Sequence, residues 1–199
     1  MTMKHGRLPW YERASLDDAQ RAIYERVAGG VRAQGPQAFP LTDDAGRLHG
    51  PFNGMLTSPS IGGALERIGA AIRFESQLGT REREIGILEV AALRRADFEW
   101  YAHERVGRKA GLTEPELDAL RTGADAPTLS PREALLRAVV RACIRDRALD
   151  DATFAAAEAE FGTRALYDLV TLAGYYDLLA LTMAVWQTPL PAGERSPFS

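Results

Sequence analysis

Cysteine is almost absent from this chain: the 199 residues contain one, Cys143. A single cysteine excludes a disulfide within the chain and any redox pair of the Cys-x-x-Cys type. Histidine is also scarce, since only His5, His49 and His103 are present. Any general acid, general base or metal ligand of the imidazole type must come from these three side chains.

The chain has no marked excess of charge of one sign. The net charge of −3 arises from interspersed acidic and basic residues, which argues against a nucleic-acid partner. Its N-terminal stretch, MTMKHGRLPWYERAS, lacks the apolar core of a signal peptide, and we identify no segment that spans a bilayer. A hydrophobic content of 46% is typical of a soluble globular protein. The expectation is a cytoplasmic protein with neither a membrane nor a nucleic-acid partner.

Alternating runs rich in β-branched residues are missing, whereas helix signals recur, so the sequence predicts an all-α fold. TEPE (113–116) and SPRE (130–133) are capping boxes with proline in the first turn. Further helices are expected at 15–27, 58–78, within 80–110, from 150 or 151 to about 162, and from 163 onward.

Glycine and proline are concentrated in residues 29–59, which we interpret as a long ordered loop. Loops of this length inside a domain are uncommon and often functional. We therefore divide the chain into an N-terminal extension (1–50, a helix plus this loop), a main domain (51–190) and a flexible tail (191–199).

The last expected helix is apolar on nearly every face, and a helix of this kind must be buried on all sides. A chain this small covers the extra face most easily with another subunit. The sequence therefore predicts a homo-oligomer.

The stretch DFEWYAHE (97–104) carries the main candidate site. Glu99 and His103 are four residues apart, so in a helix their side chains lie on one face, as a carboxylate–imidazole pair suited to acid/base work. Glu84 is a second candidate acid. In one straight helix it would lie about 28 Å from His103, but a break near 94–97, with Asp97 as N-cap, would bring the two together. The pattern alone leaves both possibilities open.

The segments PFNGMLTSP, LGTREREIGILEVAALRRADFEWYAHE, AGLTEPELDAL and DLVTLAGYYDLLA resemble, in order and spacing, the carboxymuconolactone decarboxylase family. Its superfamily also contains the AhpD-type alkylhydroperoxidases. The resemblance covers about residues 50–180. It implies an AhpD-like helical bundle with a central helical hairpin, assembled as trimers or hexamers, and it favours the break near 94–97. Glu84, Glu99 and His103 would then surround one cavity.

The peroxidase branch of this superfamily is marked by a Glu, two cysteines and a His, which fall here on Glu84, Ala96, Glu99 and His103. Both cysteines are missing. Cys143 belongs to a different expected helix, so the thiol mechanism is not expected in this chain.

The resemblance implies decarboxylation of a small carboxylated lactone or a related acid, without a metal or organic cofactor. His103 would deliver the proton, oriented by Glu99 or Glu84, and Arg73 or Arg81 would bind a carboxylate. In the LHGPFN segment (48–53), Phe52 would roof the cavity. Asn53 would donate a hydrogen bond to an oxyanion or, equally, bond to local backbone. His49 would assist proton transfer, or it is an ordinary exposed loop histidine. Trp100 is a candidate wall residue.

Three alternatives stay open at this point. The same residues would serve isomerisation, dehydration or ring formation. The chain would also fit a protein described as an AhpD-like peroxidase but lacking the two thiols, or a non-catalytic oligomer that binds a small molecule.

Overall fold

The computed structural model describes residues 3–34, 37–126 and 128–199. Eight α-helices lie within these residues, and two-residue strands β1 (Lys4–His5) and β2 (Leu8–Pro9) form an antiparallel hairpin before them. The helices are α1 (Asp18–Tyr24), α2 (Gly50–Met55), α3 (Pro59–Phe74), α4 (Thr80–Arg94), α5 (Asp97–Lys109), α6 (Glu114–Thr122), α7 (Pro131–Arg145) and α8 (Asp151–Trp186). The all-α prediction is confirmed.

The capping boxes predicted from TEPE and SPRE begin α6 and α7. The first helix, expected from residue 15, begins later, at Asp18. Asp17 caps this helix, because its carboxylate accepts from the backbone N–H of Gln20 at 2.8 Å while the Gln20 side chain accepts from Asp17. Ser15 ends a short 3-10 turn, η1 (Arg13–Ser15), and its hydroxyl donates to the Glu12 carbonyl. α1 continues into a π turn, η2 (Glu25–Gly29).

The chain reverses direction between α4 and α5, so the predicted helical hairpin is confirmed. Arg95 makes the turn in the left-handed conformation, with φ of 50° and ψ of 43°. The Ala96 N–H then bonds the Ala91 carbonyl at 2.8 Å. Ala96, and not Asp97, occupies the N-cap position of α5, and Asp97 accepts a hydrogen bond from Ser196 instead.

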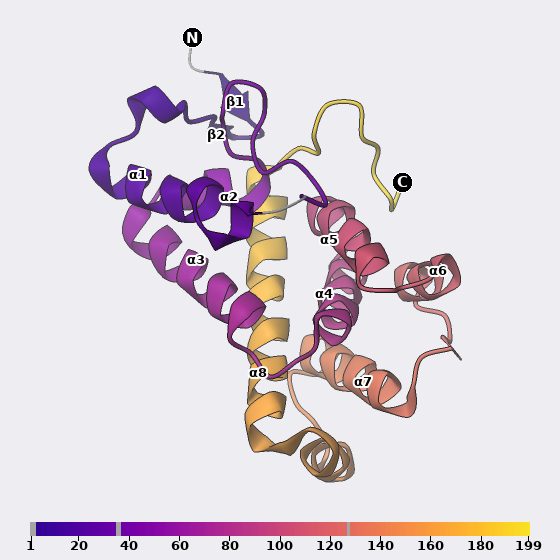
Figure 1. The fold of residues 1–199 in the computed structure, drawn as a ribbon. Helices are drawn as coiled ribbons and strands as arrows, with labels where there is room; N and C mark the ends of the chain where they lie inside the picture. The colour runs from indigo at the N-terminus through magenta and orange to yellow at the C-terminus, as the bar shows by residue number, and fades with distance from the viewer. Residues whose placement is uncertain (1–2, 35–36, 127) are drawn as a thin grey trace.

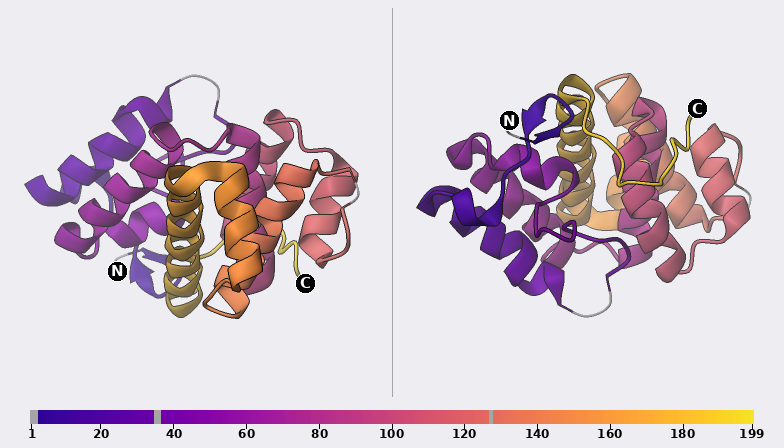
Figure 2. Two further views of the ribbon diagram at one scale, coloured as in Figure 1. Left: turned by 90° about the horizontal axis from the view of Figure 1, so that it is seen from below. Right: turned by 90° about the horizontal axis from the view of Figure 1, so that it is seen from above.

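α8 is the central element of the fold, and α2, α3, α4 and α7 pack against it (Figure 1). Its backbone breaks at Gly162, where φ is 75° and ψ is 159°, which matches the predicted change of helix at this residue. Figure 2 shows the chain turning between the two parts. Leu169 and Leu172 are fully buried in the core.

By length and composition alone α8 could cross a membrane, so the expectation that no segment meets this test is wrong. The core helix of a soluble protein meets it as well. The polar contacts of α8 favour that interpretation, because Asp168 accepts from the Gln77 N–H and Asp177 pairs with Arg94.

Several apolar side chains of α8 are exposed in the single chain. They form the apolar face for which the sequence predicts another subunit as cover. These are Phe154, before the break at Gly162, and after it Tyr167, Val170, Leu178, Leu181, Val185 and Trp186.

Residues 29–59, predicted to be an ordered loop, also contain the 3-10 turn η3 (Val31–Ala33) and the short helix α2; residues 35–36 lie outside the described residues. The segment 191–199, predicted to be a flexible tail, contacts α5. Phe198 packs edge-on against Trp100 with 5.5 Å between ring centroids, and Glu194 accepts from Arg105 at 3.0 Å.

Candidate active site

The α4–α5 hairpin brings His103 to Glu84. The distance between His103 Nδ1 and Glu84 Oε2 is 2.7 Å, although the residues are 19 positions apart in sequence. Both side chains are largely buried, with 12% and 4% of their surface exposed. When Nδ1–H donates to the ionised carboxylate, Nε2 holds the lone pair that accepts or, once protonated, delivers a proton. Glu84, and not Glu99, is therefore the residue that orients His103.

Glu99 lies one turn before His103 and faces the same cavity, but it plays a different part. Its side chain is 3% exposed, and neither carboxylate oxygen has a hydrogen-bond partner among the described residues. Burial, reinforced by the charge of Asp177, raises the pKa of Glu99 well above its usual value. Burial therefore favours the neutral acid over the carboxylate, and the neutral acid can donate a proton or a hydrogen bond.

Two arginines reach the same cavity from the other side, Arg32 on η3 and Arg73 on α3. Neither forms a salt bridge with a described residue. The Arg32 guanidinium instead lies over the Phe52 ring, with 5.2 Å from Cζ to the ring centroid, and its Nε is buried without a partner among the described residues. Burial lowers the pKa of Arg32, although a guanidinium remains protonated at neutral pH. Unpaired guanidinium groups beside a cavity are the donors that a carboxylate requires.

The rest of the cavity wall is mainly aromatic, with Phe39, Phe52, Phe98, Tyr175 and Tyr176 around it. Tyr176 meets the His103 ring edge-on at 5.2 Å, and burial raises the pKa of both tyrosines. The free volume is about 40 Å³, which is room for a few water molecules. A larger ligand therefore enters only if side chains of the wall move.

Two glycines allow this close arrangement. Gly50 has a φ of 59°, and a Cβ there would overlap the Phe98 ring, so only glycine lets α2 begin against α5. Gly69 on α3 faces Tyr175, whose hydroxyl would overlap an added Cβ.

Arg81, the other arginine predicted to bind substrate, does not line the cavity. Its guanidinium donates to Glu116 at 2.7 Å, to Glu133 at 2.6 Å and to the Gly111 carbonyl at 2.5 Å. These contacts join α4 to α6 and α7 and occupy its donors. Arg81 therefore has a structural role. Arg32, and not Arg81, is the second arginine that lines the cavity beside Arg73.

Asn53, His49 and Trp100 also lie outside the cavity lining, whereas Phe52 lies in it. Asn53 is fully buried; its Oδ1 accepts from the Tyr11 N–H at 3.2 Å and its Nδ2 donates to the Pro9 carbonyl at 3.0 Å. Both bonds are to the backbone of the N-terminal segment, so of the two roles considered for Asn53 the structure shows backbone bonding. Trp100 donates from Nε1 to Glu104 at 3.1 Å.

His49 is 6% exposed, so its interpretation as an exposed loop histidine is wrong. It packs with Trp10 and with His5, whose ring centroid lies 6.1 Å away. We name these three residues the N-terminal aromatic cluster.

Cys143 lies on α7, in a separate surface pocket with Arg147 and Leu149. Burial raises the pKa of its thiol, which is the opposite of what a reactive cysteine needs. In the part of the chain that the structure describes, no group of three or more His, Cys, Asp or Glu side chains is arranged to hold a metal ion.

Arg32 is the site residue that the sequence did not reveal. It follows Gly29 and Gly30 in the loop segment, 71 positions before His103, and no periodicity assigns it a face. The available signal was an arginine in an uncommonly long Gly/Pro-rich loop, which also contains Arg47.

Comparison with known proteins places this arrangement in context. Residues 59–142 match the sequence profile of the carboxymuconolactone decarboxylase family. A search of curated proteins gives no match.

Solved structures share the fold over nearly the whole chain. One is an uncharacterized peroxidase-related protein with an alkylhydroperoxidase AhpD core from Ralstonia eutropha JMP134: 18% identity, TM-score 0.73, covering 96% of this chain and 94% of that one. Another is an uncharacterized peroxidase-related protein from Silicibacter sp. TM1040: 14% identity, TM-score 0.74, covering 100% and 98%. A protein of unknown function from Agrobacterium tumefaciens covers 68% of this chain and 94% of its own, with 17% identity and a TM-score of 0.61. At these identities the likeness establishes the fold.

Proposed function

Because residues 59–142 belong to the carboxymuconolactone decarboxylase family and the chain has an AhpD-like fold, we propose that it is an enzyme of proton transfer on a small carboxylic acid. The observation that carries the proposal is the grouping at one cavity of two arginines without a salt bridge to a described residue, a buried carboxyl group without a hydrogen-bond partner among those residues, and an imidazole held by a carboxylate.

Each group has a distinct part. Arg32 and Arg73 bind a substrate carboxylate through charge-assisted hydrogen bonds. His103, oriented by Glu84, moves a proton to or from carbon. Glu99 donates to the oxygen on which negative charge develops.

The specific reaction that we propose is decarboxylation of a carboxylated lactone. The C–CO2 bond breaks, its electron pair passes through the ring to the lactone carbonyl oxygen, and Glu99 stabilises that oxyanion. The imidazolium of His103 then delivers a proton to carbon and the carbonyl re-forms. The departing carboxylate is one that the arginines do not hold; the aromatic wall favours its loss, because a carboxylate loses hydration there and the neutral CO2 does not.

Thiol peroxidase chemistry is a second candidate, since two solved structures that share the fold are described as peroxidase-related. It is less well supported. Cys143 lies in another pocket, and its pKa is raised. A carboxylate-binding protein without catalysis is the third candidate, and it would use Arg32 and Arg73 in the same way.

A direct test incubates the wild-type protein with a panel of carboxylated lactones in deuterium oxide. We expect release of CO2 and incorporation of one deuteron at carbon, followed by mass spectrometry and NMR. Deuterium incorporation without CO2 would replace decarboxylation by isomerisation. Binding without either would leave the non-catalytic candidate. A peroxidase activity of the wild type that is lost in Cys143→Ala would favour the thiol candidate.

A further inference from the structure

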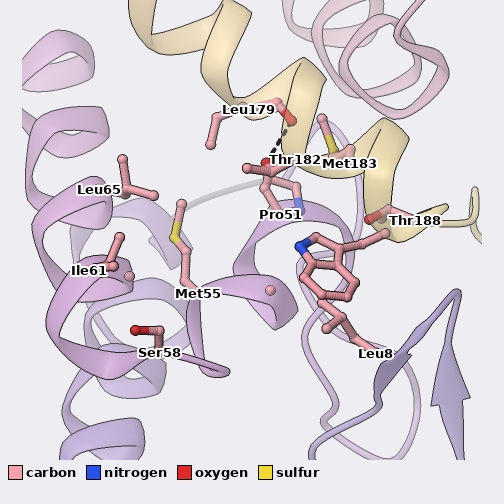
Figure 3. Close-up of a pocket in the computed structure, with 13 residues that line it drawn as sticks. Leu8, Pro51, Met55, Ser58, Ile61, Leu65, Leu179, Thr182, Met183 and Thr188 are labelled. Carbon is pink, nitrogen blue, oxygen red and sulfur yellow. Dashed lines mark hydrogen bonds between the residues drawn. The ribbon is translucent and has the colours of Figure 1, made fainter.

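A second, larger pocket adjoins the candidate site. Its free volume is about 140 Å³, against about 40 Å³ for the cavity at His103. Pro51 and Leu179 line both spaces, so these two side chains form the boundary between them. Figure 3 shows Ile61 and Leu65 of α3 facing Thr182 and Met183 of α8 across this pocket, with Met55 of α2 between them.

The two spaces follow one face of α3. Ile61 and Leu65 line the larger pocket, and Gly69 and Arg73 line the cavity. These four residues are spaced four apart, which places them in one row along the helix. The row spans twelve residues, or about 18 Å.

α8 repeats the same order on the opposite side. Tyr175 and Tyr176 line the cavity, Leu179 lies at the boundary, and Met183 and Trp186 line the larger pocket. α3 and α8 therefore line two neighbouring spaces that lie end to end, a charged one at Arg73 and a second one at Ile61, with Pro51 and Leu179 between them.

The second space is apolar. The hydroxyl of Thr182 already donates to the Leu179 carbonyl at 2.9 Å (dashed line in Figure 3). Leu8, Met55 and Leu65 supply further aliphatic surface. No ionisable side chain lines this pocket in the described part of the chain.

We propose that this pocket binds an apolar arm of the substrate, so that the substrates of the site are carboxylic acids with an alkyl or aryl substituent remote from the carboxylate. The inference rests on the proposed function, which places the carboxylate at Arg32 and Arg73. Most of the free volume lies on the apolar side, so the substituent accounts for most of the buried surface of the ligand.

Straight-chain carboxylates from butanoate to dodecanoate test the idea as probes, with binding measured by calorimetry below the concentration at which they aggregate. We expect the affinity to rise about fourfold for each added methylene and to level off once the chain extends past Ile61. Leu65→Trp fills the pocket, so it should abolish this rise and leave butanoate binding unchanged.

Ile68→Trp is the matched control, because Ile68 lies on the same helix, is exposed and does not line the pocket. It should preserve the full chain-length response. If Leu65→Trp does not fold, Ile61→Gln at an exposed wall position replaces it, and should weaken only the longest probes.

The two proposals fail in different ways. If butanoate binds and depends on Arg73 but longer chains bind no better, the apolar arm is refuted and the proposed function stands. A rise with chain length that Leu65→Trp does not change places the chains elsewhere and also refutes the arm. If no probe depends on Arg32 or Arg73 for binding, the carboxylate site itself is wrong.

Discussion

The imidazole of His103 is hydrogen-bonded through Nδ1 to the Glu84 carboxylate at 2.7 Å, across the two arms of the α4–α5 hairpin. This contact leaves Nε2 without a partner among the described residues. It also separates the functions of the two buried acids, because Glu84 is bonded and Glu99 has no partner among those residues.

Replacing His103 by alanine should reduce any turnover by about 10²–10⁴-fold, the usual contribution of a general acid or base. Glu84→Gln should be milder, since the amide oxygen can still accept the hydrogen bond from Nδ1–H and keep the ring oriented. The measurement is kcat on the lactone that the wild type converts fastest, with helicity followed by circular dichroism. Wild-type rates in the folded His103→Ala variant would move the chemistry to another residue.

Arg32→Gln and Arg73→Gln should each raise KM about 10–100-fold, the loss expected for a hydrogen bond to a charged group. Arg67→Gln is the matched control, because Arg67 lies on α3 with Arg73 but is exposed and does not line the cavity. A KM that changes equally in all three variants would indicate a general charge effect instead of a carboxylate site.

Glu99→Gln should stabilise the protein at alkaline pH while lowering its activity. The folded-state pKa of Glu99 is raised, so above its usual value of 4.5 the unfolded chain loses a proton that the folded chain retains. The free energy of unfolding therefore falls as pH rises from 4.5 through the folded-state pKa, by up to about 1.4 kcal/mol per pH unit.

Glutamine is neutral in both states and removes this fall. Urea unfolding at a series of pH values measures the free energy of unfolding, and Glu75→Gln, at an exposed position, is the control. An unchanged pH slope in Glu99→Gln would mean that Glu99 is ionised in the folded protein.

The N-terminal aromatic cluster (His5, Trp10 and His49) should loosen in acid. Burial and the charge of His49 lower the pKa of His5 to about 4, and burial lowers the pKa of His49 against the opposing charge of Asp43. The unfolded chain takes up protons first, so the free energy of unfolding falls as pH drops from about 6.5 to about 4.

His5→Phe should reduce the acid-induced fall in the free energy of unfolding. Lys4→Gln, on the same strand, should leave it unchanged. Trp10 reports the change by fluorescence, since its ring stacks on His5 at 4.9 Å. The interpretation fails if the His5→Phe protein shows the wild-type slope.

The exposed apolar face of α8 should be covered by further copies of the chain, in a trimer or hexamer. Leu181 is 61% exposed, so Leu181→Glu should lower the mass in solution without lowering helicity. Met3→Glu, at an exposed position outside α8, is the control. Light scattering of the wild type at 21.8 kDa, the mass of one chain, would contradict the assembly.

Local signals predicted much of this fold, and tertiary contacts account for what they missed. Thr113 and Ser130 marked the start of their helices because a capping box is complete within four residues. The turn at Arg95 has no glycine to mark it. It was predicted from the resemblance to a family and not from a pattern in the chain. Periodicity put Glu99 beside His103, but the partner of the imidazole comes from another helix, which no local pattern reports.

Burial in the loop segment was equally hidden. His49 and Asn53 are buried because the N-terminal hairpin packs on them, and the sequence does not state where that hairpin lies. Arg32 was missed because no local pattern reports that it lies over the Phe52 ring beside the cavity. The residues that the sequence misplaced, such as Arg81 and Asn53, are those whose place depends on long-range contacts.

The helix α2 separates the charged cavity from the apolar pocket, and it is held by Asn53 to the N-terminal strand segment. In evolutionary terms, the proposed proton-transfer residues and the residues that set ligand shape are therefore encoded in different stretches of the gene. A lineage can diversify the acids that it accepts through α2 and α3 while the α4–α5 hairpin is inherited intact. Laboratory evolution that randomises Met55, Ile61 and Leu65 has the same freedom.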